Sequence, residues 1–153
     1  MSLNSLEQRV CSVLTARHDA MIADLREAVE IPTKSGYNPG LDTYRTLMQA
    51  RLEHLGGTSR LIPGDPRPPW IDPDDRGTQP VPPPTLVVSS AHTSSLRILL
   101  CGHLDTVHPI DGPFCNFTLD VARNQATGPG IVDMKGGLVI ALHALAALAE
   151  ADA

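Results

Sequence analysis

Apolar side chains recur at three- and four-residue intervals in three parts of the chain, the spacing that places them on one face of an α-helix. The first part covers residues 6–30 and is ended by Pro32. The second begins at Asn38-Pro39, a pair typical of a helix cap and first turn, and ends at Gly56-Gly57. The third begins near Gly136 and runs to the C-terminus. The pattern therefore predicts three amphipathic helices.

Shorter runs rich in Leu, Val and Ile predict strands between the second and third helices, at residues 59–62, 85–89 and 96–101. The run at 96–101 leaves little polar face and is predicted to be central in a sheet. Residues 114–121 alternate more loosely and are predicted as an edge strand. This order predicts an α/β layered domain, in which residues just past the carboxyl ends of strands face the ligand crevice.

Residues 63–84 differ in composition from the rest, because they hold 9 of the 14 prolines. Proline cannot continue a helix or pair in a central strand, so we predict a long surface loop, with Trp70 pinning it down. Pro66-Arg67-Pro68-Pro69 fits a PxxP pattern, but a stiff, solvated insertion is the favoured interpretation.

Composition narrows the class of protein. At 153 residues and 42% hydrophobic content the chain fits a single globular domain, and its net charge of −5 argues against nucleic acid or an anionic membrane as an obligate partner. Polar residues interrupt the N-terminal region, so neither a signal peptide nor a spanning helix is expected there, and the expected location is cytoplasmic. Cys11, Cys101 and Cys115 show no CxxC spacing and are predicted to be free thiols.

The candidate chemistry lies in two glycine-flanked motifs. In His103-Leu104-Asp105 the imidazole can bind a metal ion, while the carboxylate two residues later lies on the same face and can orient the ring from behind. Asp133 follows 28 residues after Asp105, in a turn before the last helix. In a two-metal site a carboxylate of this kind bridges both ions. We therefore predict His103 and Asp133 as metal ligands and Asp105 as the residue that orients the His103 ring.

Asp133 and the residues near the two motifs also allow roles other than metal binding. Asp133 could also cap the last helix, and both roles can hold together. Gly128-Pro129-Gly130 lacks the remaining spacing of a nucleotide-binding loop. Lys135 is predicted to support the turn or form a salt bridge, and His108 to be a loop residue near the site. Cys101, which adjoins the first motif, is predicted to be a small buried hydrophobe. The remaining histidines are assigned to surface or helix faces: His18, His54, His92 and His143.

The two motifs, with the Glu30-Ile31-Pro32-Thr33 end of the first helix, resemble the M20 family of zinc exopeptidases and amidohydrolases. That group contains glutamate carboxypeptidase, aminoacylase, acetylornithine deacetylase and succinyl-diaminopimelate desuccinylase. The resemblance implies a layered α/β/α catalytic domain of which residues 1–153 form the N-terminal half, with an incomplete sheet and the loop at about 63–84 as its main departure. It also implies that Asp105 is the catalytic residue. The resemblance further implies two Zn²⁺ per complete site, with Co²⁺ or Mn²⁺ as substitutes, and a homodimer in the full-length parent.

The function implied is metal-dependent hydrolysis of amide bonds in a small peptide or an N-acyl amino acid, by an exopeptidase or a deacylase. The resemblance also implies a general-base Glu and further ligands later in such a chain, so we expect these 153 residues alone to bind metal weakly and to show no turnover. The alternative is a non-catalytic binding or interaction module derived from such an enzyme, which pairs through an open sheet edge.

Overall fold

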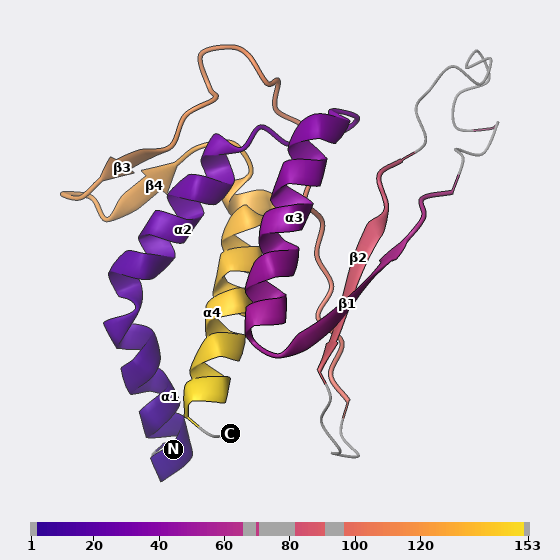
Figure 1. Ribbon diagram of the computed structural model, residues 1–153. Coiled ribbons are helices and arrows are strands. Elements are labelled where there is room, and N and C mark those ends of the chain that lie inside the picture. Colours follow the sequence, from indigo (N-terminus) through magenta and orange to yellow (C-terminus); the bar gives the residue numbers. More distant parts are fainter. Residues whose placement is uncertain (1–2, 66–69, 71–81, 91–96, 152–153) are drawn as a thin grey trace.

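A computed structural model describes residues 3–65, 70, 82–90 and 97–151. Along the chain it has four α-helices and two short antiparallel hairpins among these residues. The helices pack side by side, the first hairpin lies beside α3, and the second lies at the opposite side beyond α2 (Figure 1). The element bounds are α1 Ser5–Ala16, α2 His18–Glu30, α3 Asn38–His54, β1 Gly57–Ile62, β2 Thr85–Ser90, β3 Thr118–Asp120, β4 Gln125–Thr127 and α4 Gly136–Glu150.

The first predicted helix is interrupted at one residue. Arg17 has φ −92° and ψ 3°, which separates α1 from α2 although no glycine or proline marks the break. Asn4 and Glu7 form a reciprocal capping box at the start of α1. Of these two helices, α1 has no buried residue, whereas α2 buries Ala28 and Val29. The apolar stripe predicted for residues 6–30 is therefore buried mainly in its C-terminal half.

Helix α3 begins at Asn38, the residue that was predicted to be its cap. Asn38 is already helical and Tyr37 is the N-cap, whose side chain makes no capping hydrogen bond, so the prediction of Asn38 as the cap was wrong. Pro39 lies in the first turn, as predicted, where its missing N–H costs nothing. Gly40 is buried because the backbone of Pro32 passes so close that a Cβ would lie 1.7 Å from its carbonyl oxygen.

The predicted strands at 59–62 and 85–89 are present as β1 and β2, which pair antiparallel from Gly57 opposite Ser90 to Ile62 opposite Thr85. The predicted central strand at 96–101 was wrong for the residues described. Residues 97–100 are extended but lie in no strand, and Ile98, Leu99 and Leu100 are 78%, 84% and 59% exposed. An apolar run becomes a strand only where another backbone pairs with it, and the described strands pair only among themselves.

The predicted edge strand at 114–121 is reduced to β3, which pairs only with β4 in a separate hairpin. Asn124, with φ 52°, forms the turn between them. Proline-rich residues 66–69, with the PxxP pattern, lie outside the described residues. Trp70 is 78% exposed, so the prediction that it pins the loop by burial was wrong.

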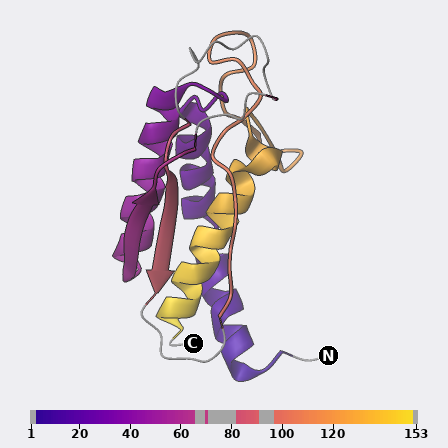
Figure 2. The same ribbon diagram turned by 90° about the vertical axis from the view of Figure 1, so that its right-hand side faces the viewer.

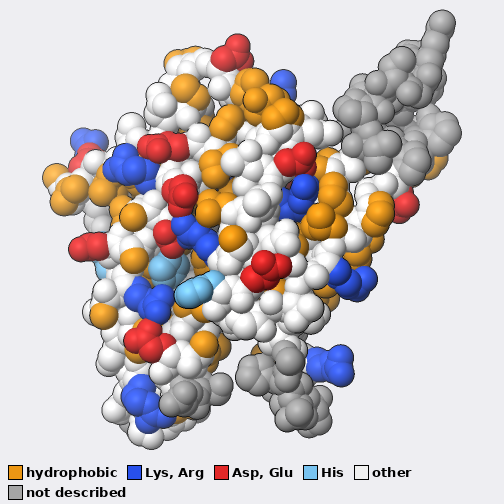
Figure 3. Space-filling model, in the orientation of Figure 1, with side chains coloured by type: hydrophobic (Ala, Val, Ile, Leu, Met, Phe, Trp, Pro, Cys, Tyr) orange, Lys and Arg blue, Asp and Glu red, His pale blue; other side chains and the backbone are white. Residues whose placement is uncertain are grey.

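The hydrophobic core lies where α2, α3 and α4 meet, and its buried cluster comprises Ala28, Tyr44, Met48 and Val139. A polar network joins the same helices: Arg51 of α3 contacts Asp24 and Glu27 of α2, and His143 of α4 contacts Asp24 at 2.8 Å. On the face shown in Figure 3, charged and histidine side chains gather over the helices, while hydrophobic ones gather near the β1–β2 hairpin. His143 is 4% exposed, so it is a buried helix residue.

Helix α4 is strongly apolar. Among the described residues, one helical stretch, Ile131–Glu150, is long and apolar enough by length and composition to cross a membrane, a test that core helices of soluble proteins also pass. In this fold α4 packs against α1 and α2, burying Leu142 and Ala147 among other side chains. The extended segment 97–105 runs alongside it (Figure 2), and Gly102 lies against Leu138 of α4.

Candidate active site

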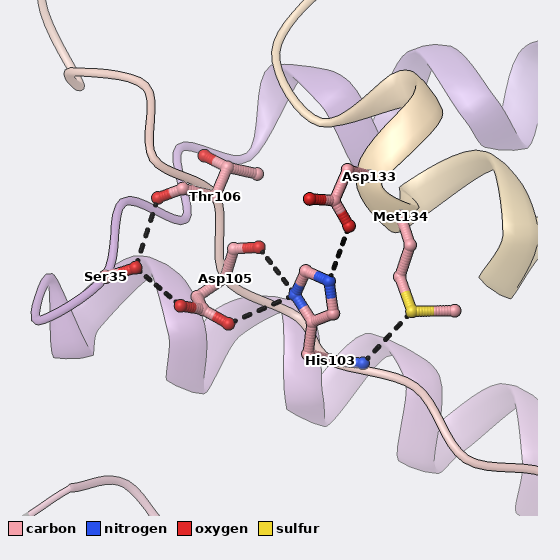
Figure 4. Close-up of polar contacts among 6 residues, drawn as sticks. All are labelled: Ser35, His103, Asp105, Thr106, Asp133 and Met134. Carbon is pink, nitrogen blue, oxygen red and sulfur yellow. Dashed lines mark hydrogen bonds and ion pairs between the residues drawn. The ribbon is translucent and has the colours of Figure 1, made fainter.

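The three residues predicted to carry the chemistry lie together in the structure (Figure 4). The His103 Nε2 atom lies 2.8 Å from Oδ1 of Asp133. On the other side of the ring, Nδ1 lies 3.0 Å from the backbone oxygen of Asp105 and 3.2 Å from its Oδ1. The ring is therefore held between two carboxylates from segments 28 to 30 residues apart.

A short backbone bridge positions the first motif. Thr106 N–H donates to the carbonyl of Thr33 at 2.8 Å, and Ser35 N–H donates to the carbonyl of Thr106 at 2.9 Å. These bonds tie the segment after α2 to the end of the extended segment that carries His103 and Asp105. Because Thr33 and Thr106 are both buried, this bridge is a fixed base for the site.

The second motif is a tight turn, Ile131–Lys135, that ends in α4 and contains a cis peptide bond between Asp133 and Met134. Gly130 enters this turn with φ +73°, and a Cβ there would lie 2.4 Å from Thr106 Cγ2. Only glycine fits both requirements, because other residues rarely adopt this φ and would collide with the bridge. The turn thus brings Asp133 over the first motif.

The side chain of Lys135 connects the same turn to helix α2. Its side chain is 1% exposed, and Nζ donates to the carbonyls of Ala28 and Ile31 at 2.8 and 2.7 Å. These carbonyls lie at the C-terminal end of α2, where the helix dipole favours a cation. The prediction that Lys135 supports the turn is confirmed, with backbone carbonyls as its acceptors. Burial lowers the pKa of Lys135 to about 8.

The electrostatics of the site favour a protonated ring. Hydrogen bonding to Asp133 is the main cause that raises the pKa of His103, with Asp105 adding to it. Both ring nitrogens face oxygen acceptors, which is the arrangement of an imidazolium that donates from each nitrogen. The pKa of Asp105 is lowered, chiefly by the Ser35 hydroxyl that donates to it. Asp105 therefore stays ionised to a lower pH than an ordinary aspartate side chain.

A cleft of about 260 Å³ opens beside these groups. His103, Asp105 and Asp133 line one part of it, and the rings of His108 and Phe114, which meet edge to face at a centroid distance of 4.9 Å, line another. The cleft thus combines titratable groups with an apolar wall, as small-molecule sites commonly do. His108 is a loop residue, as predicted, and it also borders the cleft.

The donor set suits a metal ion in kind. Nε2 of His103 and Oδ1 of Asp133 are in direct contact at 2.8 Å, and Asp105 lies at the opposite ring nitrogen, the arrangement seen behind metal-bound histidines. Within the described part of the chain, however, no group of three or more His, Cys, Asp or Glu could hold an ion. Two donors are fewer than the three protein ligands that a catalytic zinc usually takes.

Sequence reasoning missed two contacts of this site. Ser35 donates to Oδ2 of Asp105 at 2.5 Å, and the Met134 sulfur accepts from His103 N–H at 3.3 Å. No local pattern marks either, since their partners lie 70 and 31 residues away. The prediction that Cys101 is buried was wrong: it is exposed, because the extended segment that carries it is uncovered.

An α/β domain with a histidine between two carboxylates in one cleft defines a class that includes metal-dependent hydrolases. Residues 99–153 match Peptidase family M20/M25/M40. The chain is 28% identical over 142 residues to Carboxypeptidase G2 of Pseudomonas sp. (strain RS-16). The match covers 89% of this chain and 29% of that protein. The similarity to this family therefore lies in part of the chain, which includes both motifs.

The fold is similar to that of the di-peptidase Dug1p of Saccharomyces cerevisiae, with a TM-score of 0.81 and 18% sequence identity. The match covers 97% of this chain and 32% of that one. The chain therefore spans about a third of the length of these relatives. The predicted α/β fold class is confirmed by this similarity of fold.

Proposed function

We propose that this chain supplies part of the active site of a zinc-dependent hydrolase of amide bonds, an exopeptidase or an N-acyl-amino-acid deacylase. One observation carries the proposal: a histidine nitrogen and a carboxylate oxygen lie 2.8 Å apart at the wall of a cleft, with a second carboxylate at the other ring nitrogen. The names of the relatives, a carboxypeptidase and a di-peptidase, support peptide bonds as the substrate class.

In this proposal His103 and Asp133 hold zinc, and Asp105 fixes the tautomer and orientation of the His103 ring. Bound zinc supplies a Lewis acid for the scissile carbonyl and lowers the pKa of the attacking water. The chain's own residues do the positioning: the backbone bridge at Thr106 and the Lys135 anchor bring the two motifs to one point. Residues 1–153 then form the N-terminal portion of a catalytic domain, and the free cysteines support a cytoplasmic location.

The test is zinc binding by the chain, measured by isothermal titration calorimetry and by the absorption of Co²⁺ as a substitute. We expect weak binding by the wild type, and His103→Ala or Asp133→Ala to lower the affinity by at least about 10–100-fold, the loss that outer partners alone can cause. His18→Ala, which removes an exposed histidine on α2, is the matched control and should leave the affinity unchanged. Equal affinity in all four proteins would contradict the proposal.

A second candidate function is an interaction module that pairs through its uncovered segment. The exposure of Ile98, Leu99 and Leu100 favours it, because contiguous apolar surface of this kind commonly marks an interface. A discrete dimer in solution would support this candidate and the homodimer expected of the parent. Association that grows without limit with concentration would count against both.

A further inference from the structure

Ser35 lies outside both motifs, in the segment between α2 and α3, yet its side chain reaches the site (Figure 4). Its hydroxyl donates to Oδ2 of Asp105 at 2.5 Å, whereas the carbonyl of Thr106, a second acceptor, lies 3.4 Å away. A serine hydroxyl has one proton to donate, so the closer carboxylate oxygen is its principal acceptor. The two oxygens of Asp105 therefore have different partners: Oδ2 accepts from Ser35 and Oδ1 faces Nδ1 of His103.

We infer that Ser35 is a positioning residue, which holds the Asp105 carboxylate so that its other oxygen orients the His103 ring and leaves Nε2 directed at Asp133. The inference rests on the proposed function, because it gives Ser35 a part in preparing a metal ligand. Asp105 needs such a partner: its side chain is 43% exposed, and without one it would exchange between rotamers. Among the described residues, Ser35 and His103 are the side chains that hydrogen-bond to this carboxylate.

The hydroxyl is not required to hold the backbone. The bridge between the two segments consists of main-chain hydrogen bonds, Ser35 N–H to Thr106 and Thr106 N–H to Thr33, and a side-chain substitution leaves both intact. Ser35 is itself exposed, so its loss creates no cavity. Ser35→Ala should therefore fold normally, and its effect should be confined to Asp105 and to the ring that Asp105 orients.

The first arm of the test uses the metal-free chain. Three-bond couplings from Asp105 Cγ to its backbone nitrogen and carbonyl carbon report its χ1 angle by nuclear magnetic resonance. We expect couplings typical of one staggered rotamer in the wild type, averaged couplings in Ser35→Ala, and a return to one rotamer in Ser35→Thr, which keeps the hydroxyl. Ser12→Ala deletes a hydroxyl that bonds only within α1 and is the matched control.

The second arm measures Zn²⁺ affinity of the same proteins by calorimetry. We expect Ser35→Ala to weaken binding by about tenfold, at the lower end of the effect of groups that orient metal ligands, with Ser35→Thr and Ser12→Ala close to the wild type. Unchanged Asp105 couplings in Ser35→Ala would overturn the inference, and so would Ser35→Thr behaving like Ser35→Ala. A wild type that binds no zinc contradicts the proposed function, whereas the couplings in the metal-free chain still decide the role of Ser35.

Discussion

At the scale of single residues, the centre of the site is a ring with an acceptor on each side. Asp133 and Asp105 both favour the charged form of His103, which raises its pKa. The sign of the effect on stability follows from linkage. A raised pKa in the folded state means that the stabilisation is fully present below about 6.5, the ordinary value, and is lost as the pH rises through the folded-state value.

Asp133→Asn removes the charged acceptor at Nε2 while keeping the shape of the side chain. We expect the pKa of His103 to fall towards 6.5, because the main cause of its rise is the bond to Asp133. A pH titration of the His103 Cε1–H resonance measures this directly. Asp19→Asn, which alters the partner of the exposed His18, should leave the His103 titration unchanged. A His103 pKa that does not respond to Asp133→Asn would show that the 2.8 Å contact is not formed in solution.

At the scale of elements, the turn Ile131–Lys135 depends on the buried Lys135 side chain. The unfolded chain keeps this lysine protonated up to a pKa near 10.5, whereas burial lowers the folded value to about 8. Between these values the unfolded state binds more protons, so the contribution of Lys135 to the free energy of unfolding increases as the pH rises from about 8 to 10.5.

Lys135→Met should lower the free energy of unfolding by about 1–3 kcal/mol near neutral pH, because the carbonyls of Ala28 and Ile31 lose their donor. The difference in the free energy of unfolding between wild type and variant should increase from about pH 8 to 10.5. Urea unfolding followed by circular dichroism at several pH values gives this difference. Lys34→Met, which replaces the only other lysine, an exposed one, is the matched control for the loss of a lysine. A difference between wild type and Lys135→Met that does not change with pH would contradict the assignment.

Local sequence patterns predicted where helices and strands form better than they predicted which segments pair with or contact one another. The helical periodicity located α3 and α4, and short apolar runs located β1 and β2, because these features are encoded within a few neighbouring residues. The run at 96–101 was mispredicted because strand formation depends on a second backbone, which no local pattern reveals. For the same reason the motifs indicated His103, Asp105 and Asp133, whereas Ser35, 70 residues from its partner Asp105, could be found only in the fold.

At the scale of the whole molecule, Ile98, Leu99 and Leu100 form the longest run of consecutive exposed large apolar side chains among the described residues. Extended backbone with apolar side chains and no neighbouring strand is prone to pair with another chain. On helix α4, Ile140 is a further exposed apolar side chain, at 61% exposure. We therefore expect the isolated chain to self-associate through this run.

Leu99→Lys places a charge in the middle of the run, where Leu99 is 84% exposed. We expect a lower average mass in sedimentation or light-scattering measurements at equal concentration, because a lysine at an edge opposes pairing. Val121→Lys is the matched control, since Val121 is 80% exposed but lies at the second hairpin, apart from the run. If both substitutions lowered the mass equally, added charge alone would explain the result and the run would not be the interface.

The anchorage of Lys135 on α2 has one more consequence. The lysine ammonium holds the Asp133 turn against carbonyls that belong to the central helix packing, so the turn cannot open without disturbing that packing. An ion captured between the two motifs would therefore shift the melting temperature of the entire chain, in proportion to how tightly it is held. Simple thermal scans with and without added salts of candidate ions would then rank those ions by preference.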